Sequence, residues 1–149
     1  MPMQNHLSEV ATEGMTALAD LHSLSVDTHL GFQKMAEKAE PDFRPIAQQF
    51  SALHERQVSS LHKMLRDMGG VPDDNGSFMG TVNRAVVTLR SLFDAIDSGV
   101  MDQVRSGEQS VLEAFDHAIA AGLPKDHSEA LTQMKGELTS LLQETRNLA

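Results

Sequence analysis

Glu108 is the residue whose type and position most suggest chemistry. It falls between Val104 and Phe115 in an apolar stripe of helical spacing, so the pattern predicts a side chain that points into the protein interior. An unpaired carboxylate is costly there, and Glu108 therefore needs a partner. Other polar residues interrupt apolar stripes in the same way, and we predict a buried polar layer formed by Thr28, Gln57, Glu108 and Thr145, with Ser25 beside it.

Two interpretations of Glu108 remain open. It is either part of a metal or ligand site, or a glutamate held by hydrogen bonds for structural reasons. Buried carboxylates with shifted titration are common in both settings, and the sequence favours the structural interpretation.

Seven histidines invite a metal hypothesis, but their spacing argues against chelation within one helix. His22 and His29 are seven residues apart, and His54 and His62 are eight apart. Each separation corresponds to about 10–12 Å along a helix, whereas a metal ion needs donor atoms at about 2 Å. Any metal site would have to combine several helices.

Glu113 and His117 are four residues apart and share one helix face, which makes them the best chelating pair within a single helix. The apolar stripe passes through other positions, so we expect this pair to be solvated. The candidate metal ligands are Glu108, Glu113 and His117, and no catalytic or cofactor-binding residue is predicted.

Composition excludes several classes of function. The absence of cysteine rules out disulfides, thiol catalysis and thiolate zinc sites. The net charge is −9 and the basic residues are scattered, so neither a nucleic-acid surface nor a membrane surface is expected. No run approaches the ~18 apolar residues of a membrane span, and the first residues do not resemble a secretion signal, which favours a cytoplasmic protein.

The elements that must position these residues are all helical. Turn formers and helix breakers gather at residues 69–80, where Gly69, Gly70 and Pro72 divide the chain into two halves. Apolar periodicity predicts helices over residues 5–39, 42–68, 77–96, 100–121 and 125–148, with Asp42 as the N-cap of the second. We expect one domain over residues 1–149, with residues 1–16 as a helical extension. The fold class is all-α, an antiparallel four-helix bundle whose two hairpins are joined by the crossover helix 77–96.

The linker carries a resemblance to a known family. Gly69-Gly70-x-Pro72, Gly76-Ser77-x-x-Gly80, Arg84, Gly107-Glu108 and Leu123-Pro124 resemble an uncharacterised bacterial family of ferritin-like four-helix-bundle proteins, a domain of unknown function. The resemblance covers residues 18–148 and implies a ferritin-like bundle that can dimerise. Ferritin-like metal sites use Glu-x-x-His, and no Glu in this chain is followed three positions later by His.

The sequence thus favours a non-catalytic bundle without a cofactor that acts through oligomerisation, most simply as a homodimer, or through an unidentified protein partner. The resemblance adds a stress-related role. The main alternative is a ferritin-like protein that binds iron, manganese or zinc through carboxylates and histidines. A third hypothesis is a pocket for a small apolar ligand, suggested by the small residues Gly14, Gly31, Ala36 and Gly136.

Overall fold

The computed structural model of the protein describes residues 2–72 and 95–147, with side chains from residue 12 onward. Its regular elements in this part of the chain are α1 (Pro2–Lys38), α2 (Arg44–Asp67), the short 3₁₀ helix η1 (Ser98–Val100), α4 (Met101–Ile119) and α5 (Lys125–Glu144). The all-α prediction is therefore confirmed for the described residues, where an isolated bridge between Ala39 and Ile96 is the single β contact. The predicted crossover helix lies outside the described residues except for its last two positions.

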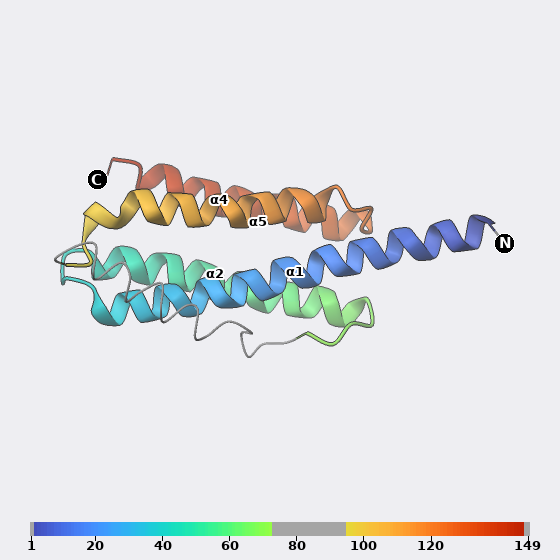
Figure 1. Ribbon diagram of the computed structural model, residues 1–149, viewed down its shortest axis with the longest axis horizontal. Coiled ribbons are helices and arrows are strands. Elements are labelled where there is room, and N and C mark those ends of the chain that lie inside the picture. Colours follow the sequence, from blue (N-terminus) through green and yellow to red (C-terminus); the bar gives the residue numbers. More distant parts are fainter. Residues whose placement is uncertain (1, 73–94, 148–149) are drawn as a thin grey trace.

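The four long helices pack as a bundle of two hairpins (Figure 1). α1 lies against α2 and α4, and α5 lies against α4 and α2, with neighbours antiparallel. α2 and α4 run in the same direction, so α2 ends at one end of the bundle and α4 begins at the other.

Glycines in the left-handed conformation follow α2 and α4, at the breaks that the sequence predicts after residues 68 and 121. Gly69 has φ +84° just after α2. Its N–H donates to the Arg66 carbonyl at 3.0 Å, and the Gly70 N–H donates to the Leu65 carbonyl at 2.8 Å, which satisfies two carbonyls at the helix end. Gly122 has φ +83° and lies between α4 and α5, where the chain reverses direction.

The predicted N-cap of α2 is wrong by one residue. Phe43, not Asp42, occupies the cap position, and no side chain caps the helix. Phe43 is buried in the core, and its burial fixes the start of the helix. Arg44 stabilises the connection between α1 and α2 instead, because its guanidinium donates to the carbonyls of Ala36 and Ala39 at 3.1 and 2.9 Å.

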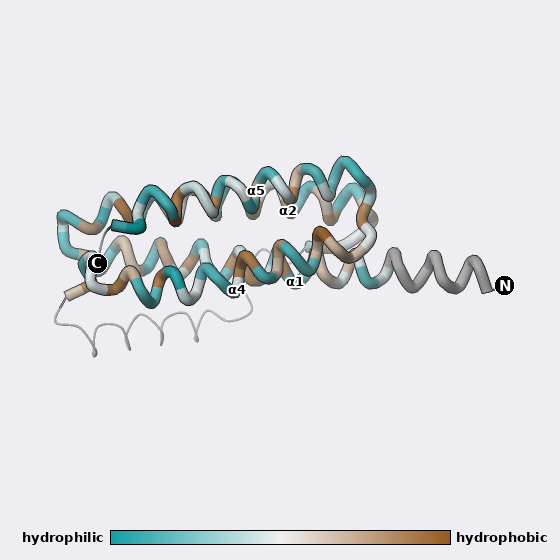
Figure 2. Tube along the Cα trace, turned by 90° about the horizontal axis from the view of Figure 1, so that it is seen from above, coloured by the Kyte–Doolittle hydropathy of each residue, from teal (hydrophilic) through white to brown (hydrophobic). Residues whose placement is uncertain are grey.

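The core lies along the axis of the bundle. Figure 2 shows hydrophobic positions recurring along each described helix between hydrophilic ones, the pattern of helices with one buried face. The rings of Phe32 and Phe50 stack with centroids 4.9 Å apart. The largest apolar side chains with almost no exposure come from all four helices and include Leu18, Leu21, Phe50, Leu61, Phe115, Leu131 and Leu138.

α1 is much longer than its neighbours. It has 37 residues, against 24 in α2 and 20 in α5, and its first part projects beyond the end of the bundle (Figure 1). A Cβ added at Gly14 would lie 3.0 Å from Leu123 Cδ2, so α1 still packs on the α4–α5 connection at this point. Residues 2–13, called the overhang below, continue for about 18 Å. None of the described helices has the length and apolar character needed to cross a membrane.

Candidate functional site

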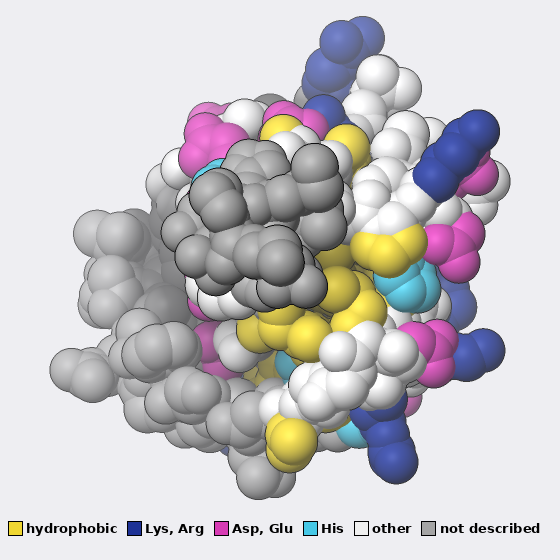
Figure 3. Space-filling view, turned by 90° about the vertical axis from the view of Figure 1, so that its right-hand side faces the viewer, with side chains coloured by type: hydrophobic (Ala, Val, Ile, Leu, Met, Phe, Trp, Pro, Cys, Tyr) yellow, Lys and Arg dark blue, Asp and Glu magenta, His cyan; other side chains and the backbone are white. Residues whose placement is uncertain are grey.

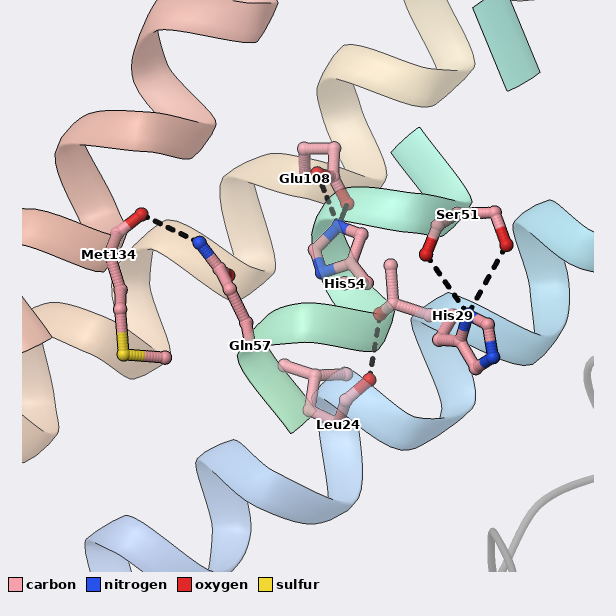
Figure 4. A network of polar contacts seen from close by, with 8 residues as sticks. Leu24, His29, Ser51, His54, Gln57, Glu108 and Met134 are labelled. Atoms are coloured by element: carbon pink, nitrogen blue, oxygen red, sulfur yellow. Dashed lines mark hydrogen bonds and ion pairs between the residues drawn. The ribbon is translucent and has the colours of Figure 1, made fainter. Parts of the chain in front are cut away.

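An imidazole and a carboxylate meet in the middle of the bundle. His54 on α2 and Glu108 on α4 are joined by Nε2, which lies 2.8 Å from Oε2 and 3.1 Å from Oε1 (Figure 4). Their side chains are 0% and 1% exposed. This contact gives Glu108 the partner that its interior position requires, and it joins the two hairpins of the bundle.

The donor and acceptor roles of the two groups follow from their chemistry when Glu108 is a carboxylate. A carboxylate accepts hydrogen bonds, so with Glu108 ionised the Nε2 of His54 carries a proton and donates to both carboxylate oxygens. The ring of Phe32 stacks on the imidazole with centroids 5.9 Å apart and an interplanar angle of 8°. Phe50 stacks on Phe32 in turn, so aromatic packing holds the imidazole plane in place.

Gln57 adds a second polar connection one helical turn further along α2. Its Nε2 donates to the backbone carbonyl of Met134 on α5 at 2.8 Å (Figure 4). His54 and Gln57 are three residues apart and therefore share a face of α2. This face of α2 is bonded to α4 through Glu108 and to α5 through Gln57.

The other residues of the predicted polar layer bond within their own helices. Thr28 is half-buried and its hydroxyl donates to the Leu24 carbonyl at 2.7 Å. Thr145 is buried and donates to the Leu141 carbonyl at 2.9 Å. The structure therefore brings Glu108 together with His54, which sequence reasoning did not place in the layer.

A signal for His54 was present in the sequence. Phe50, His54, Gln57 and Leu61 follow one another at spacings of four, three and four, which is one helix face, and all four are buried. The spacing of histidines along one helix pairs His54 only with His62. Its true partner comes from a different helix.

Three buried polar atoms of the interior have no hydrogen-bond partner among the described residues. They are His54 Nδ1 in the pair itself, Gln57 Oε1 one turn further along α2, and Ser25 Oγ on α1. With Nε2 protonated, Nδ1 is a free lone pair, so two of the three atoms can only accept hydrogen bonds. The interior of the bundle thus contains hydrogen-bond acceptors that the described residues leave unsatisfied, in addition to the His54–Glu108 contact.

Other histidines of the described bundle make different contacts. His29 Nδ1 donates to the Ser51 carbonyl at 3.0 Å, and the rings of His22 and His62 meet edge to face with centroids 6.2 Å apart. Glu113 and His117 are both exposed on α4.

The described residues do not match the dinuclear metal site of ferritin-like bundles. Such a site takes four carboxylates and two imidazoles, whereas no group of three or more His, Cys, Asp or Glu capable of holding a metal ion occurs in residues 12–72 and 95–147. In place of a ligand set, the nitrogen and oxygen atoms of His54 and Glu108 face each other.

Comparison with known proteins identifies a family whose function is unknown. A family model described as "Domain of unknown function (DUF2383)" matches residues 13–121. No curated protein and no solved structure matches the chain.

Proposed function

Since the chain belongs to a family of unknown function (DUF2383), we propose its role from its geometry: a non-catalytic bundle of the ferritin-like type that acts by pairing with a second copy of itself through the overhang of α1. The observation that carries this proposal is the length of α1, which continues through residues 2–13 past the end of the other described helices.

A projecting helix of this length is not expected to persist alone. Isolated helices shorter than about 12–15 residues are marginal in water, and most helical stability in proteins comes from packing an apolar face. The apolar stripe predicted from the sequence runs on into the overhang through Leu7 and Val10. A partner that covers this stripe would supply the missing packing.

The end of the bundle beside the overhang is also apolar. Figure 3 looks onto this end and shows hydrophobic side chains gathered near its middle. Val71, just beyond α2, is 96% exposed. Met15 and Met68 are partly buried against the core. These three side chains give a second copy apolar surface to contact at this end.

A second copy is the simplest partner for such a surface. Two identical chains related by a two-fold axis present the same overhang to each other, so each contact is made twice. The interior supports a structural role, because His54 and Glu108 are engaged with each other.

Sedimentation equilibrium tests the proposal. The intact chain is expected to behave as a particle of about twice its 16.3 kDa mass at micromolar concentration, and a variant that begins at Thr12 is expected to be monomeric. Circular dichroism of the shortened variant serves as the control, since a folded bundle must be retained. A full-length chain that stays monomeric over the whole concentration range would contradict the proposal.

Metal binding is a second candidate, favoured by the meeting of a carboxylate and an imidazole from two helices in the interior. It requires a ring nitrogen of His54 and the carboxylate of Glu108 to coordinate the same metal ion. Elemental analysis of untagged protein would support this candidate if iron, manganese or zinc were present at one or more equivalents and were lost in His54→Leu. Metal below a tenth of an equivalent would count against it.

A further inference from the structure

A groove lies at the base of the overhang, between α1 and the C-terminal end of α4. It has a volume of about 540 Å³ and is lined on the α1 side by Thr12, Glu13, Thr16 and Ala17. On the α4 side it is lined by His117, Ala120 and Ala121.

The lining of this groove suits a helix. Five of its seven lining residues are small: two threonines and one alanine on the α1 wall, and two alanines on the α4 wall. Ala17 is buried, with 2% of its surface exposed. The distance between packed helix axes is 8–10 Å and depends on the size of the side chains at the contact. Small residues therefore let another helix approach closely.

We propose that this groove receives the overhang of the second copy, which rests on the proposed function above and names the surface where pairing occurs. The groove begins at Thr12 and Glu13, where the overhang of the same chain leaves the bundle. A two-fold axis close to residue 11 of α1 would lay the two α1 helices antiparallel. Each overhang would then cover the groove of the other chain, while the two overhangs also touch near the axis.

The area of such a contact suffices for a weak dimer. An axis at residue 11 lays residues 2–20 of the two α1 helices against each other, a length of about 28 Å on each chain. The facing half of a helix about 10 Å wide then has an area of roughly 450 Å² on each chain, or roughly 900 Å² in total. Stable specific interfaces begin at about 1,200 Å² in total, so the docking gives a dimer in the size range of weak, reversible contacts.

Two matched substitutions in the full-length chain test the groove. Ala120 is exposed at the C-terminal end of α4, where an arginine is compatible with the helix. Ala52 is exposed on α2 in a comparable groove of about 490 Å³ that faces α5, far along the chain from the overhang. Ala120→Arg places a large charged side chain in the proposed contact, and Ala52→Arg places the same side chain outside it.

Sedimentation equilibrium is expected to give a dimer dissociation constant raised at least tenfold by Ala120→Arg and unchanged by Ala52→Arg. Unchanged dimerisation of Ala120→Arg would contradict docking in this groove but would leave the proposed dimerisation through the overhang in place. Equal weakening of the dimer by both substitutions would also contradict docking in this groove, because the effect would not depend on position. An unsubstituted chain that is monomeric would overturn both proposals together.

Discussion

At the scale of single residues, the His54–Glu108 contact decides how the two hairpins meet. Both side chains are buried, and each would be left without its partner if the other were removed. Losing one member of a buried pair costs far more than losing both, because a single remaining polar group stays desolvated and unpaired. The pair therefore makes one arrangement of α2 and α4 much more favourable than a shifted one.

We predict that Glu108→Leu lowers the free energy of unfolding by about 1–3 kcal/mol, since the Nε2–H of His54 then has no acceptor in the interior. Glu108→Gln keeps an oxygen that can accept from Nε2 and is expected to cost only about 1 kcal/mol. Urea unfolding followed by circular dichroism measures both values.

The double variant His54→Leu with Glu108→Leu completes this series. It is expected to be more stable than Glu108→Leu alone, because no unpaired polar group remains. Glu113→Leu, at an exposed position of the same helix, is the control and should change stability by no more than about 0.5 kcal/mol. Additive losses in the double variant would show that the two side chains do not act as a pair.

At the scale of elements, the helix boundaries depend on backbone conformation as much as on packing. Gly69 adopts φ +84°, a region that side chains disfavour, and it closes α2. Gly136 lies inside α5, where an added Cβ would meet nothing within 4 Å among the described residues. The same substitution is therefore expected to have opposite effects at the two positions.

Gly136→Ala is predicted to raise the free energy of unfolding by about 0.5–1 kcal/mol, because alanine restricts the unfolded chain and favours the helix. Gly69→Ala is predicted to lower it by about 1–2 kcal/mol, because the left-handed conformation strains an alanine. Thermal unfolding of both variants checks the opposite signs. Stabilisation by both substitutions would show that α2 does not end in the conformation described.

The sequence predicts the elements better than it predicts their contacts. The break at Gly69 and Gly70, the turn at Gly122 and the helical stripes follow from local backbone preferences, and they agree with the structure. Asp42 was misplaced as a cap because the burial of Phe43, a tertiary effect, sets the start of α2. The partner of Glu108 depends on how two hairpins dock, which the spacing of residues along one helix does not contain.

At the scale of the whole molecule, the bundle is uneven at its two ends. From Gly14 onward α1 packs on the rest of the bundle, with its longest contact against α2 and a further contact against α4, whereas the residues before Gly14 project beyond the bundle. The overhang, the exposed Val71 and the groove between α1 and α4 all lie at this end. The described interior is held by apolar packing and the buried His54–Glu108 pair, whereas the features suited to a partner are concentrated where α1 projects.

Pairing through the overhang is most directly tested by measuring a distance between two copies. The chain has no cysteine, so Gln4→Cys provides a single site for a nitroxide label in the overhang. Antiparallel overhangs that cross near residue 11 would separate the two labels by about 20–35 Å, given a rise of 1.5 Å per residue. Pulsed electron–electron double resonance should then show a defined intermolecular distance in this range, and a signal containing only the uniform background of separate molecules would contradict the account.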